Sequence, residues 1–144
     1  MAIKISAGLR TALMGTSGMK TLLDGGFMKI YSGGQPTTAD HTETGTLLAT
    51  ISTTSGTGGL IFGTAAAGQL PKSYDTWSGV IVAAGVAGYF RIYGTAGTSG
   101  SSSSEKRIDG AIGTVSADMS LSNNSLTVGA TVTIDSFYVE LPAS

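Results

Sequence analysis

Apolar and polar residues alternate with a period of two along most of the chain after residue 26, and clusters of Gly, Ser, Thr, Asn or Asp interrupt the alternation. Successive side chains of a β-strand point to opposite faces, so this pattern is typical of strands with one buried face. Several such strands, separated by turn residues at roughly eight- to twelve-residue intervals, indicate a sandwich or barrel. The predicted strands are residues 27–31, 47–52, 59–62, 79–84, 86–93, 107–115, 119–121, 126–128 and 132–141.

The strand at residues 86–93, VAGYFRIY, shows the alternation most clearly. Its even-numbered residues are expected to face the core, and its odd-numbered residues, which include Tyr89, Arg91 and Tyr93, to face the other side of the sheet. No segment between the strands has the pattern of a crossover helix, so antiparallel pairing is favoured. We therefore predict an all-β fold, a jelly roll or antiparallel β-sandwich with a short helical N-terminal segment.

Two segments depart from plain alternation. The last predicted strand, TVTIDSFYVEL, changes phase after Ile134, and a β-bulge near Asp135 and Ser136 accounts for the change. The run GTAGTSGSSSSE, residues 94–105, is too polar to pack, so we expect a flexible, exposed loop between two strands.

The only helical signals lie in residues 6–24. Ser6 is a suitable N-cap for a first helical turn that ends near Gly15, and a second turn begins at Ser17 and ends before a pair of glycines. We expect two short helical turns here.

These signals divide the chain into an N-terminal arm, residues 1–26, and a β-sandwich domain, residues 27–144. The arm has two interpretations that the sequence leaves open. It is either a mobile segment that docks on a neighbouring protein or a lid over one end of the core.

Composition narrows the functional classes. At 144 residues the chain is long enough for one domain with a sizeable core, and it contains no cysteine for disulfides, zinc sites or thiol chemistry. Charged residues make up 12% and the net charge is −1, which argues against a nucleic-acid backbone as the main partner. Soluble domains carry about a quarter charged residues, so the deficit suggests that a partner covers part of the surface. The longest apolar stretch is short and contains Arg91, so neither a membrane span nor a signal peptide is predicted.

His41 is the only histidine in the chain. With Glu43 it has the spacing of two ligands of a 2-His-1-carboxylate iron site, but such a site needs a second histidine. A Ser-His-Asp site has no nucleophile motif, because G-x-S-x-G does not occur. We expect His41 to be a solvated residue of a loop, residues 33–45, that connects two strands.

Carboxylates are harder to dismiss. Four of them are candidates for the acid and base of a glycosidase: Asp109, Asp118, Asp135 and Glu140. Each also has a simpler explanation as a turn, strand-end or outward-facing residue, which we favour. The glycine-rich stretches at residues 55–59 and 95–100 lack the Lys and the following helix of a phosphate-binding loop. We predict no catalytic, cofactor-binding or metal site.

Contact with another protein is the more suitable role for the cationic and aromatic residues. Tyr89, Arg91 and Tyr93 resemble a base-stacking platform, although aromatic pairs also stabilise outer sheet faces. Lys106 and Arg107 beside the serine run are either a cationic tip for a partner's carboxylates or a solvated charge pair of a flexible loop. The predicted partner-binding residues are Arg10, Lys20, Tyr89, Arg91, Tyr93, Lys106 and Arg107.

Trp77 is the only tryptophan in the chain. It is either an anchor for a sugar or an interface, or a core-edge residue that closes one end of the barrel. We prefer the second interpretation, because a buried aromatic residue supplies much of the core of a small β-domain.

Nearly the whole chain resembles a family of small virion proteins. The segments that carry the resemblance are AIKIS and GLR near the start, then KIYSGGQPTTAD, TGTLLATI, FGTAAAGQLPK, WSG, FRIYGTAG, RIDGAIGT, ADMSL and FYVELP. In this order they are similar to the capsid cement, or decoration, proteins of tailed bacteriophages.

This resemblance implies a jelly-roll subunit without enzymatic activity that is made in the host cytoplasm and sits on the outer surface of the capsid. Its partners would be adjacent major capsid proteins and a second copy of itself, as a homodimer. Nucleic acid, membrane and small-molecule substrates are not expected. Arg10, Lys20 and the N-terminal arm would reach a neighbouring capsid subunit.

Two other classes of function stay open. A tail- or fibre-associated module that binds a receptor or carbohydrate also uses a β-sandwich with Ser/Thr-rich loops, and exposed aromatic residues would be its mark. A glycosidase that uses two of the four carboxylates ranks third.

Overall fold

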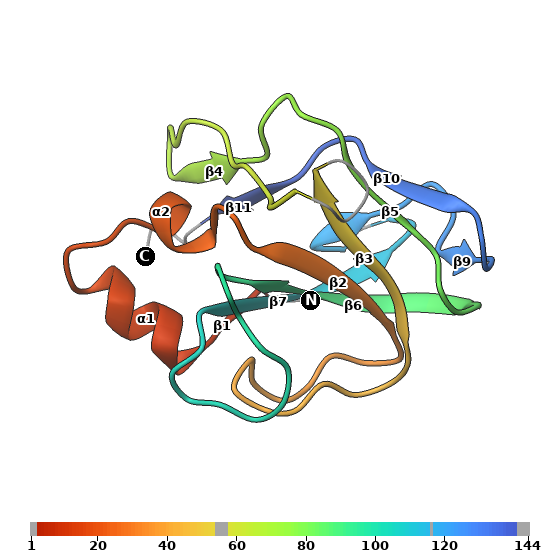
Figure 1. The fold of residues 1–144 in the computed structure, drawn as a ribbon, viewed down its shortest axis with the longest axis horizontal. Helices are drawn as coiled ribbons and strands as arrows, with labels where there is room; N and C mark the ends of the chain where they lie inside the picture. Colours follow the sequence, from red (N-terminus) through yellow and green to blue (C-terminus); the bar gives the residue numbers. More distant parts are fainter. Residues whose placement is uncertain (1–2, 54–57, 116, 141–144) are drawn as a thin grey trace.

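The structure is a computed structural model that describes residues 3–53, 58–115 and 117–140 (Figure 1). In chain order its elements are β1 (Lys4–Ile5), α1 (Ala7–Leu13), α2 (Met19–Leu23), β2 (Phe27–Ser32), β3 (Leu47–Thr53), β4 (Gln69–Pro71), β5 (Trp77–Val80), β6 (Gly85–Tyr93), β7 (Arg107–Gly113), β8 (Met119–Ser120), β9 (Ser125–Leu126), β10 (Thr131–Ile134) and β11 (Tyr138–Glu140).

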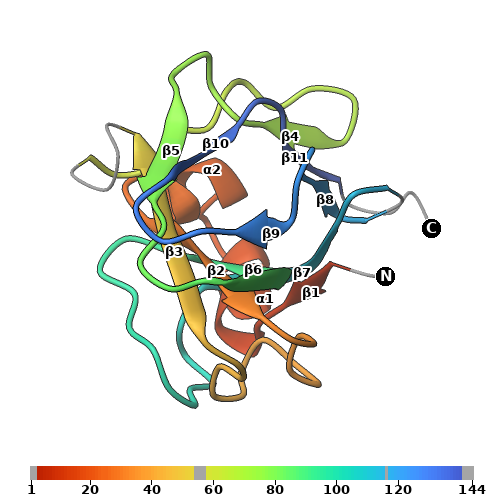
Figure 2. The same ribbon diagram turned by 90° about the vertical axis from the view of Figure 1, so that its right-hand side faces the viewer.

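These strands form an antiparallel β-sandwich with a short helical N-terminal segment, as the alternation predicted. Neighbouring strands follow the order β1-β7-β6-β2-β3-β5-β10. β3 joins the two layers, because Ile51 lies opposite Met28 of β2 whereas Thr53 lies opposite Trp77 of β5. One layer is β1-β7-β6-β2-β3, and the other contains β5, β10 and the small sheet β4-β11 (Figure 2). The two layers enclose one core, so we describe the fold as a sandwich.

Aromatic residues from both layers meet in the core. Phe90 of β6 contacts Phe137 edge to face, with 5.4 Å between the ring centroids. Trp77 contacts Phe62 in the same way at 5.1 Å, and its side chain has no exposed surface. Such pairs contribute about 0.5–1.5 kcal/mol beyond the apolar area that they bury. The interpretation of Trp77 as a core residue is confirmed.

Several strand boundaries differ from the prediction. The predicted strand at residues 59–62 is reduced to an isolated bridge between Phe62 and Lys72, and the one at residues 79–84 is replaced by β5, which ends at Val80. β1 and β4 were not predicted, because two or three residues are too few to show a period. β7 and β8 pair in parallel, which is an exception to the antiparallel expectation.

The last predicted strand is two strands. β10 pairs with β5, whereas β11 pairs with β4, and residues 135–137 between them belong to neither. The phase change at Asp135 is therefore real, but it marks a crossing between sheets. A bulge within one strand does not describe it.

The N-terminal segment is part of the sandwich. β1 pairs with β7, and Leu9 of α1 and Leu23 of α2 lie fully buried in the common core. Ser6 is the N-cap of α1, as predicted, and its Oγ accepts a hydrogen bond from the Leu9 N–H at 3.2 Å. The second helical turn was expected to begin at Ser17, but Gly18 is the N-cap residue of α2. The interpretation of the N-terminal segment as a lid over the core fits these helices, and the interpretation as a mobile arm does not.

Gly8 shows how closely α1 docks. A Cβ atom at this position would lie 2.3 Å from the carbonyl oxygen of Ser104, so only glycine permits the contact. The loop that carries Ser104 is therefore packed against the first helix.

Candidate contact surfaces and the buried charged network

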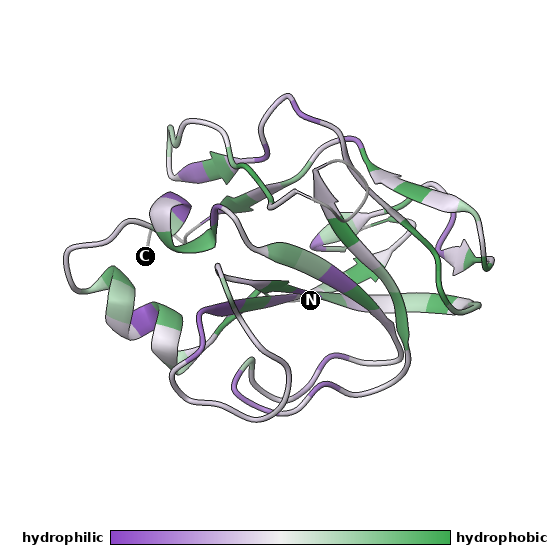
Figure 3. Cartoon of the chain, in the orientation of Figure 1, coloured by the Kyte–Doolittle hydropathy of each residue, from purple (hydrophilic) through white to green (hydrophobic). Residues whose placement is uncertain are grey.

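The side of the first layer that faces away from the core is covered by two loops. Tyr89, Arg91 and Tyr93 lie on this side, as the alternation predicted, but all three are fully buried. Residues 33–46 and 94–106 cross over them below the sheet in Figure 1, and these loops carry little hydrophobic colour in Figure 3. Partner contact was predicted for these three residues, but the two loops cover them in this structure. Alternation gives the face of a side chain but not what covers that face.

Arg91 and Asp109 form a buried ion pair across β6 and β7. Arg91 Nε lies 2.6 Å from Asp109 Oδ1 and Nη2 lies 2.7 Å from Oδ2, and both side chains are completely buried. Burial alone would lower the pKa of Arg91, but the hydrogen bonds and charge of Asp109 outweigh burial and raise the pKa above its ordinary value. Arg91 is therefore a permanent cation within the protein.

The remaining donors of Arg91 reach the loop between β2 and β3. Nη1 donates to the His41 carbonyl oxygen at 2.8 Å and to Glu43 Oε1 at 3.0 Å. The His41 residue is exposed, and its ring atom Nδ1 lies 3.3 Å from Thr38 Oγ1. The prediction of a solvated loop histidine is confirmed.

Glu43 links both loops to the sheet. Its Oε1 accepts a hydrogen bond from the Tyr93 hydroxyl at 2.6 Å, and its Oε2 accepts one from the Gly100 N–H at 2.9 Å. Burial alone would raise the pKa of Glu43, but these hydrogen bonds and the charge of Arg91 outweigh burial and lower the pKa. Burial and the bonds to Glu43 and Tyr31 raise the pKa of Tyr93, which stays a neutral donor.

Arg107 is part of this network and does not form a cationic tip. It is fully buried, its Nη2 donates to the Thr98 carbonyl oxygen at 2.6 Å, and its guanidinium lies 5.7 Å from the Tyr93 ring centroid. The neighbouring Lys106 is exposed. Of the predicted cationic pair, only Lys106 is therefore available to a partner.

Asp40 ties three segments together. The Ala7 N–H at the start of α1 donates to Asp40 Oδ1 at 2.9 Å, and the Ser102 N–H donates to the Asp40 carbonyl oxygen at 2.8 Å. Residues 94–105, predicted to be a free loop, are thus held at Thr98, Gly100 and Ser102. Together these bonds attach both loops, residues 33–46 and 94–106, to the charged network.

Of the two cationic residues predicted in the arm, Arg10 is exposed and Lys20 is not free. Lys20 Nζ lies 2.6 Å from Asp24 Oδ2 and also donates to the Phe62 carbonyl oxygen at 2.6 Å. Lys20 therefore holds α2 on the sandwich, although its side chain is 44% exposed.

Three of the four candidate carboxylates have separate hydrogen-bond partners. Asp109 is paired with Arg91, Asp118 accepts a hydrogen bond from the Ala111 N–H at 2.8 Å, and Glu140 accepts one from Gln69 Nε2 at 2.8 Å. Within residues 3–53, 58–115 and 117–140, no three His, Cys, Asp or Glu side chains gather as a metal site would require.

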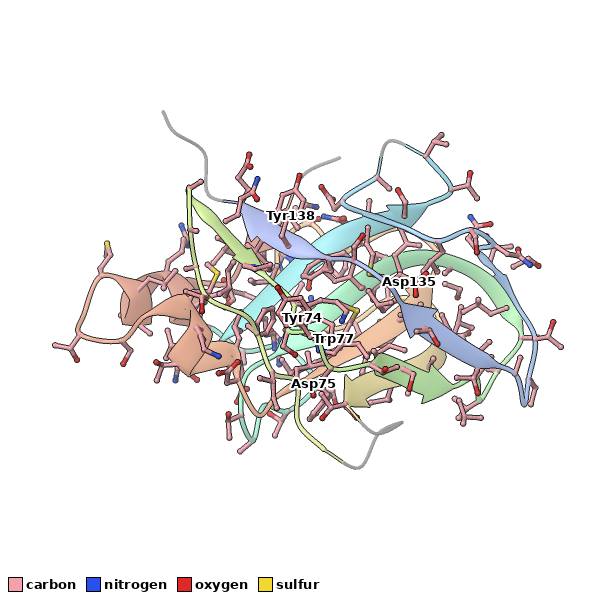
Figure 4. All side chains as sticks on the ribbon, turned by 90° about the horizontal axis from the view of Figure 1, so that it is seen from above. Tyr74, Asp75, Trp77, Asp135 and Tyr138 are labelled. Carbon is pink, nitrogen blue, oxygen red and sulfur yellow. The ribbon has the colours of Figure 1, made fainter. Side chains whose placement is uncertain are left out.

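Aromatic exposure occurs on the opposite side of the molecule, over β4 and β11. Tyr138 of β11 lies opposite Pro71 and is 52% exposed, while Val139 next to it is buried. Tyr74 is fully exposed, and Ile61, whose carbonyl oxygen accepts a hydrogen bond from Ser73 N–H, is 45% exposed. We call Ile61, Tyr74 and Tyr138 the tyrosine face. Figure 4 looks onto this side, where Asp75 and Asp135 are also labelled.

The sequence analysis did not single out the tyrosine face. The sequence did contain a signal for Tyr138. Phe137 and Val139 on either side of it are buried, so Tyr138 between them points outward. Tyr74 lies in a loop without periodicity, so only the structure shows its exposure.

A groove of about 450 Å³ runs along β10 on the same side of the molecule. Its lining comes from residues 120–123 and 125–127, from residues 130–133, 135 and 136, and from Ile81. Most of these residues are Ser, Thr or Asn. We call it the β10 groove. Its only charged lining residue is Asp135, at the end nearer the tyrosine face.

Comparisons with protein-family models, with curated proteins and with solved structures gave no match to this chain. Neither helix in the described part of the chain has the length and apolar character needed to cross a bilayer.

Proposed function

We propose that this protein is a structural virion subunit that binds the outside of a tailed-bacteriophage capsid and holds adjacent major capsid proteins together. It has no catalytic role in this proposal. The observation that carries it is a contrast between two sides of the molecule: Arg91 and Asp109 are paired in a buried network on one side, while Tyr74 and Tyr138 are exposed on the other.

The physical properties of the tyrosine face suit protein contact. Tyr supplies a large contact area at a low cost in side-chain entropy, and it is enriched at interfaces and among their energetically dominant residues. The surface carries few charges, so little desolvation of full charges opposes docking. A subunit that touches two capsid proteins at once gains further from effective concentration, and it stabilises only the assembled shell.

The direct test is binding of the purified protein to empty capsids of the phage that encodes it. We expect saturable binding that weakens roughly tenfold or more in the double variant Tyr74→Ala/Tyr138→Ala. Val115→Ala is the matched control, because Val115 is 75% exposed but does not belong to the tyrosine face. Absence of saturable binding by the wild-type protein would overturn the proposed function, and equal binding by the double variant would remove the tyrosine face from it.

A second candidate is a carbohydrate-binding module of a tail or fibre. The observation that favours it is the exposure of Tyr74 and Tyr138 on the side that also presents Asp75 and Asp135, since aromatic rings and carboxylates together suit sugar rings and hydroxyls. A glycan array with the wild-type protein separates the two candidates. The capsid-binding proposal expects no glycan signal, whereas a signal lost in Tyr74→Ala would support the carbohydrate module.

A further inference from the structure

The direction of the main-chain groups in β10 follows from its pairing with β5. Ile81, just after β5, donates its N–H to the Ala130 carbonyl oxygen at 2.9 Å, so the main chain of Ile81 faces β10. Hydrogen-bonding direction alternates along an antiparallel strand, so Gly79, two residues earlier, also faces β10. Gly79 lies opposite Val132, and Val132 must therefore face β5.

The same alternation turns Thr131 and Thr133 to the other edge of β10. β10 is the last strand of the main sheet, and among the described strands only β5 pairs with it. The N–H and C=O groups of these two threonines thus form a free edge. Proteins usually blunt such an edge with Lys or Pro, and β10, with the sequence TVTI, has neither.

The lining of the β10 groove includes Thr131 and Thr133, which form this edge, and also Ile81, which faces β10 from the paired side. The lining also includes the apolar residues Leu121, Leu126 and Val132, and hydroxyl-bearing residues flank them. The volume of about 450 Å³ is within the usual range for ligand-binding pockets. The groove therefore combines unpaired main-chain groups with apolar and hydroxyl-bearing lining residues.

We propose that the β10 groove binds an extended segment of a partner protein, which adds to the sheet as a strand antiparallel to β10. Main-chain hydrogen bonds to Thr131 and Thr133 would supply affinity, and alternate side chains would supply specificity.

The side chains of β10 define the chemistry of this segment. Val132 and Ile134 point inward and Thr131 and Thr133 outward, so a paired strand would place apolar residues inward and polar residues outward. Asp135 is the only charge in the groove, which favours a cationic residue opposite it. Because the segment runs antiparallel to β10, this cationic residue lies at the N-terminal end of the segment.

A blocked pentapeptide, acetyl-Lys-Val-Thr-Val-Ser-amide, meets these requirements and is the probe for the test. NMR of the ¹⁵N-labelled full-length protein would follow its binding and the exchange of single amides. At saturation we expect the Thr131 and Thr133 amides, which exchange fast in the free protein, to slow roughly tenfold. Shift changes should be confined to residues 120–136.

Proline at position 133 removes an edge N–H without removing a bond to β5, so Thr133→Pro should abolish binding while the protein stays folded. Thr133→Ala keeps the N–H and is the matched control, with an affinity within about threefold of wild type. An unchanged pattern of distant amide shifts in both variants verifies the fold.

Three results would overturn the inference: no shift changes with the peptide, shift changes away from the groove, or binding that survives Thr133→Pro. Slow exchange of Thr131 and Thr133 that depends only on protein concentration would also overturn it, because the edge would then pair with a second copy. Weaker binding of a peptide with Glu in place of Lys, with the difference reduced by salt, would support the role of Asp135. Because the probe is a synthetic peptide, capsid binding and strand addition can fail separately.

Discussion

From Tyr89 to Tyr93 the two sides of β6 are equally buried but by different means. Phe90 and Ile92 face the core, where apolar side chains of the other layer cover them. Tyr89, Arg91 and Tyr93 face away from the core, where two polar loops cover them through hydrogen bonds. An apolar core requires only matching shapes, whereas a buried charge requires a partner for each donor and acceptor. The covered polar side therefore fixes the conformation of its loops, which the apolar side does not do.

The largest expected effect comes from removal of Arg91. Arg91→Ala leaves Asp109 and Glu43 without their counter-ion in a buried site, and loss of one partner of a buried ion pair costs about 3–5 kcal/mol. Urea unfolding of the variant measures this loss of stability.

A double variant sharpens this result. Arg91→Met/Asp109→Leu removes both charges of the pair and should destabilise the protein less than Arg91→Ala does. A double variant that is less stable than the single one would show that the pair itself, and not the uncompensated charge, dominates the energy.

The next comparison sets one deletion on each side of β6. Tyr93→Phe removes the hydroxyl that donates to Glu43, and a hydrogen bond to a charged group contributes about 1.5–3 kcal/mol. Ile92→Val removes one methylene from the core side and should cost about 0.5–1.5 kcal/mol. Equal losses in the two variants would contradict the view that hydrogen bonds hold the outer side.

The smallest effect is a dependence on pH. Because the pKa of Glu43 is lowered in the folded protein, its stabilisation is complete above the unfolded value, about 4.3, and is lost as the pH falls through the folded value. The stability difference between wild type and Glu43→Gln should therefore narrow as the pH drops below about 4. Urea unfolding at a series of pH values measures it, and a difference that is constant with pH would exclude an ionised Glu43.

The sequence was sufficient for features that depend on local pattern. Period-two alternation predicted the fold class and the bounds of β2, β3 and β6 to within one or two residues. The N-cap at Ser6 and the phase change at Asp135 were also visible, because each depends on residues close together in the chain.

Features that depend on distant segments were not predictable in this way. Arg91 meets Glu43 and Asp109 from two other elements, and no spacing in the sequence brings them together. Low hydrophobicity made residues 94–105 resemble a free loop, although hydrogen bonds to Glu43 and Asp40 hold them. The free edge of β10 depends on sheet order, which alternation does not contain.

The most direct measurement for the contrast between the two sides of β6 is hydrogen exchange at the Gly100 amide, which donates to Glu43. If the charged network fixes the covering loops, this amide exchanges nearly as slowly as the amides of β6 in the wild-type protein and becomes fast in Glu43→Gln. Fast exchange at Gly100 in the wild-type protein, with β6 protected, would show that the loops open freely and would contradict this claim.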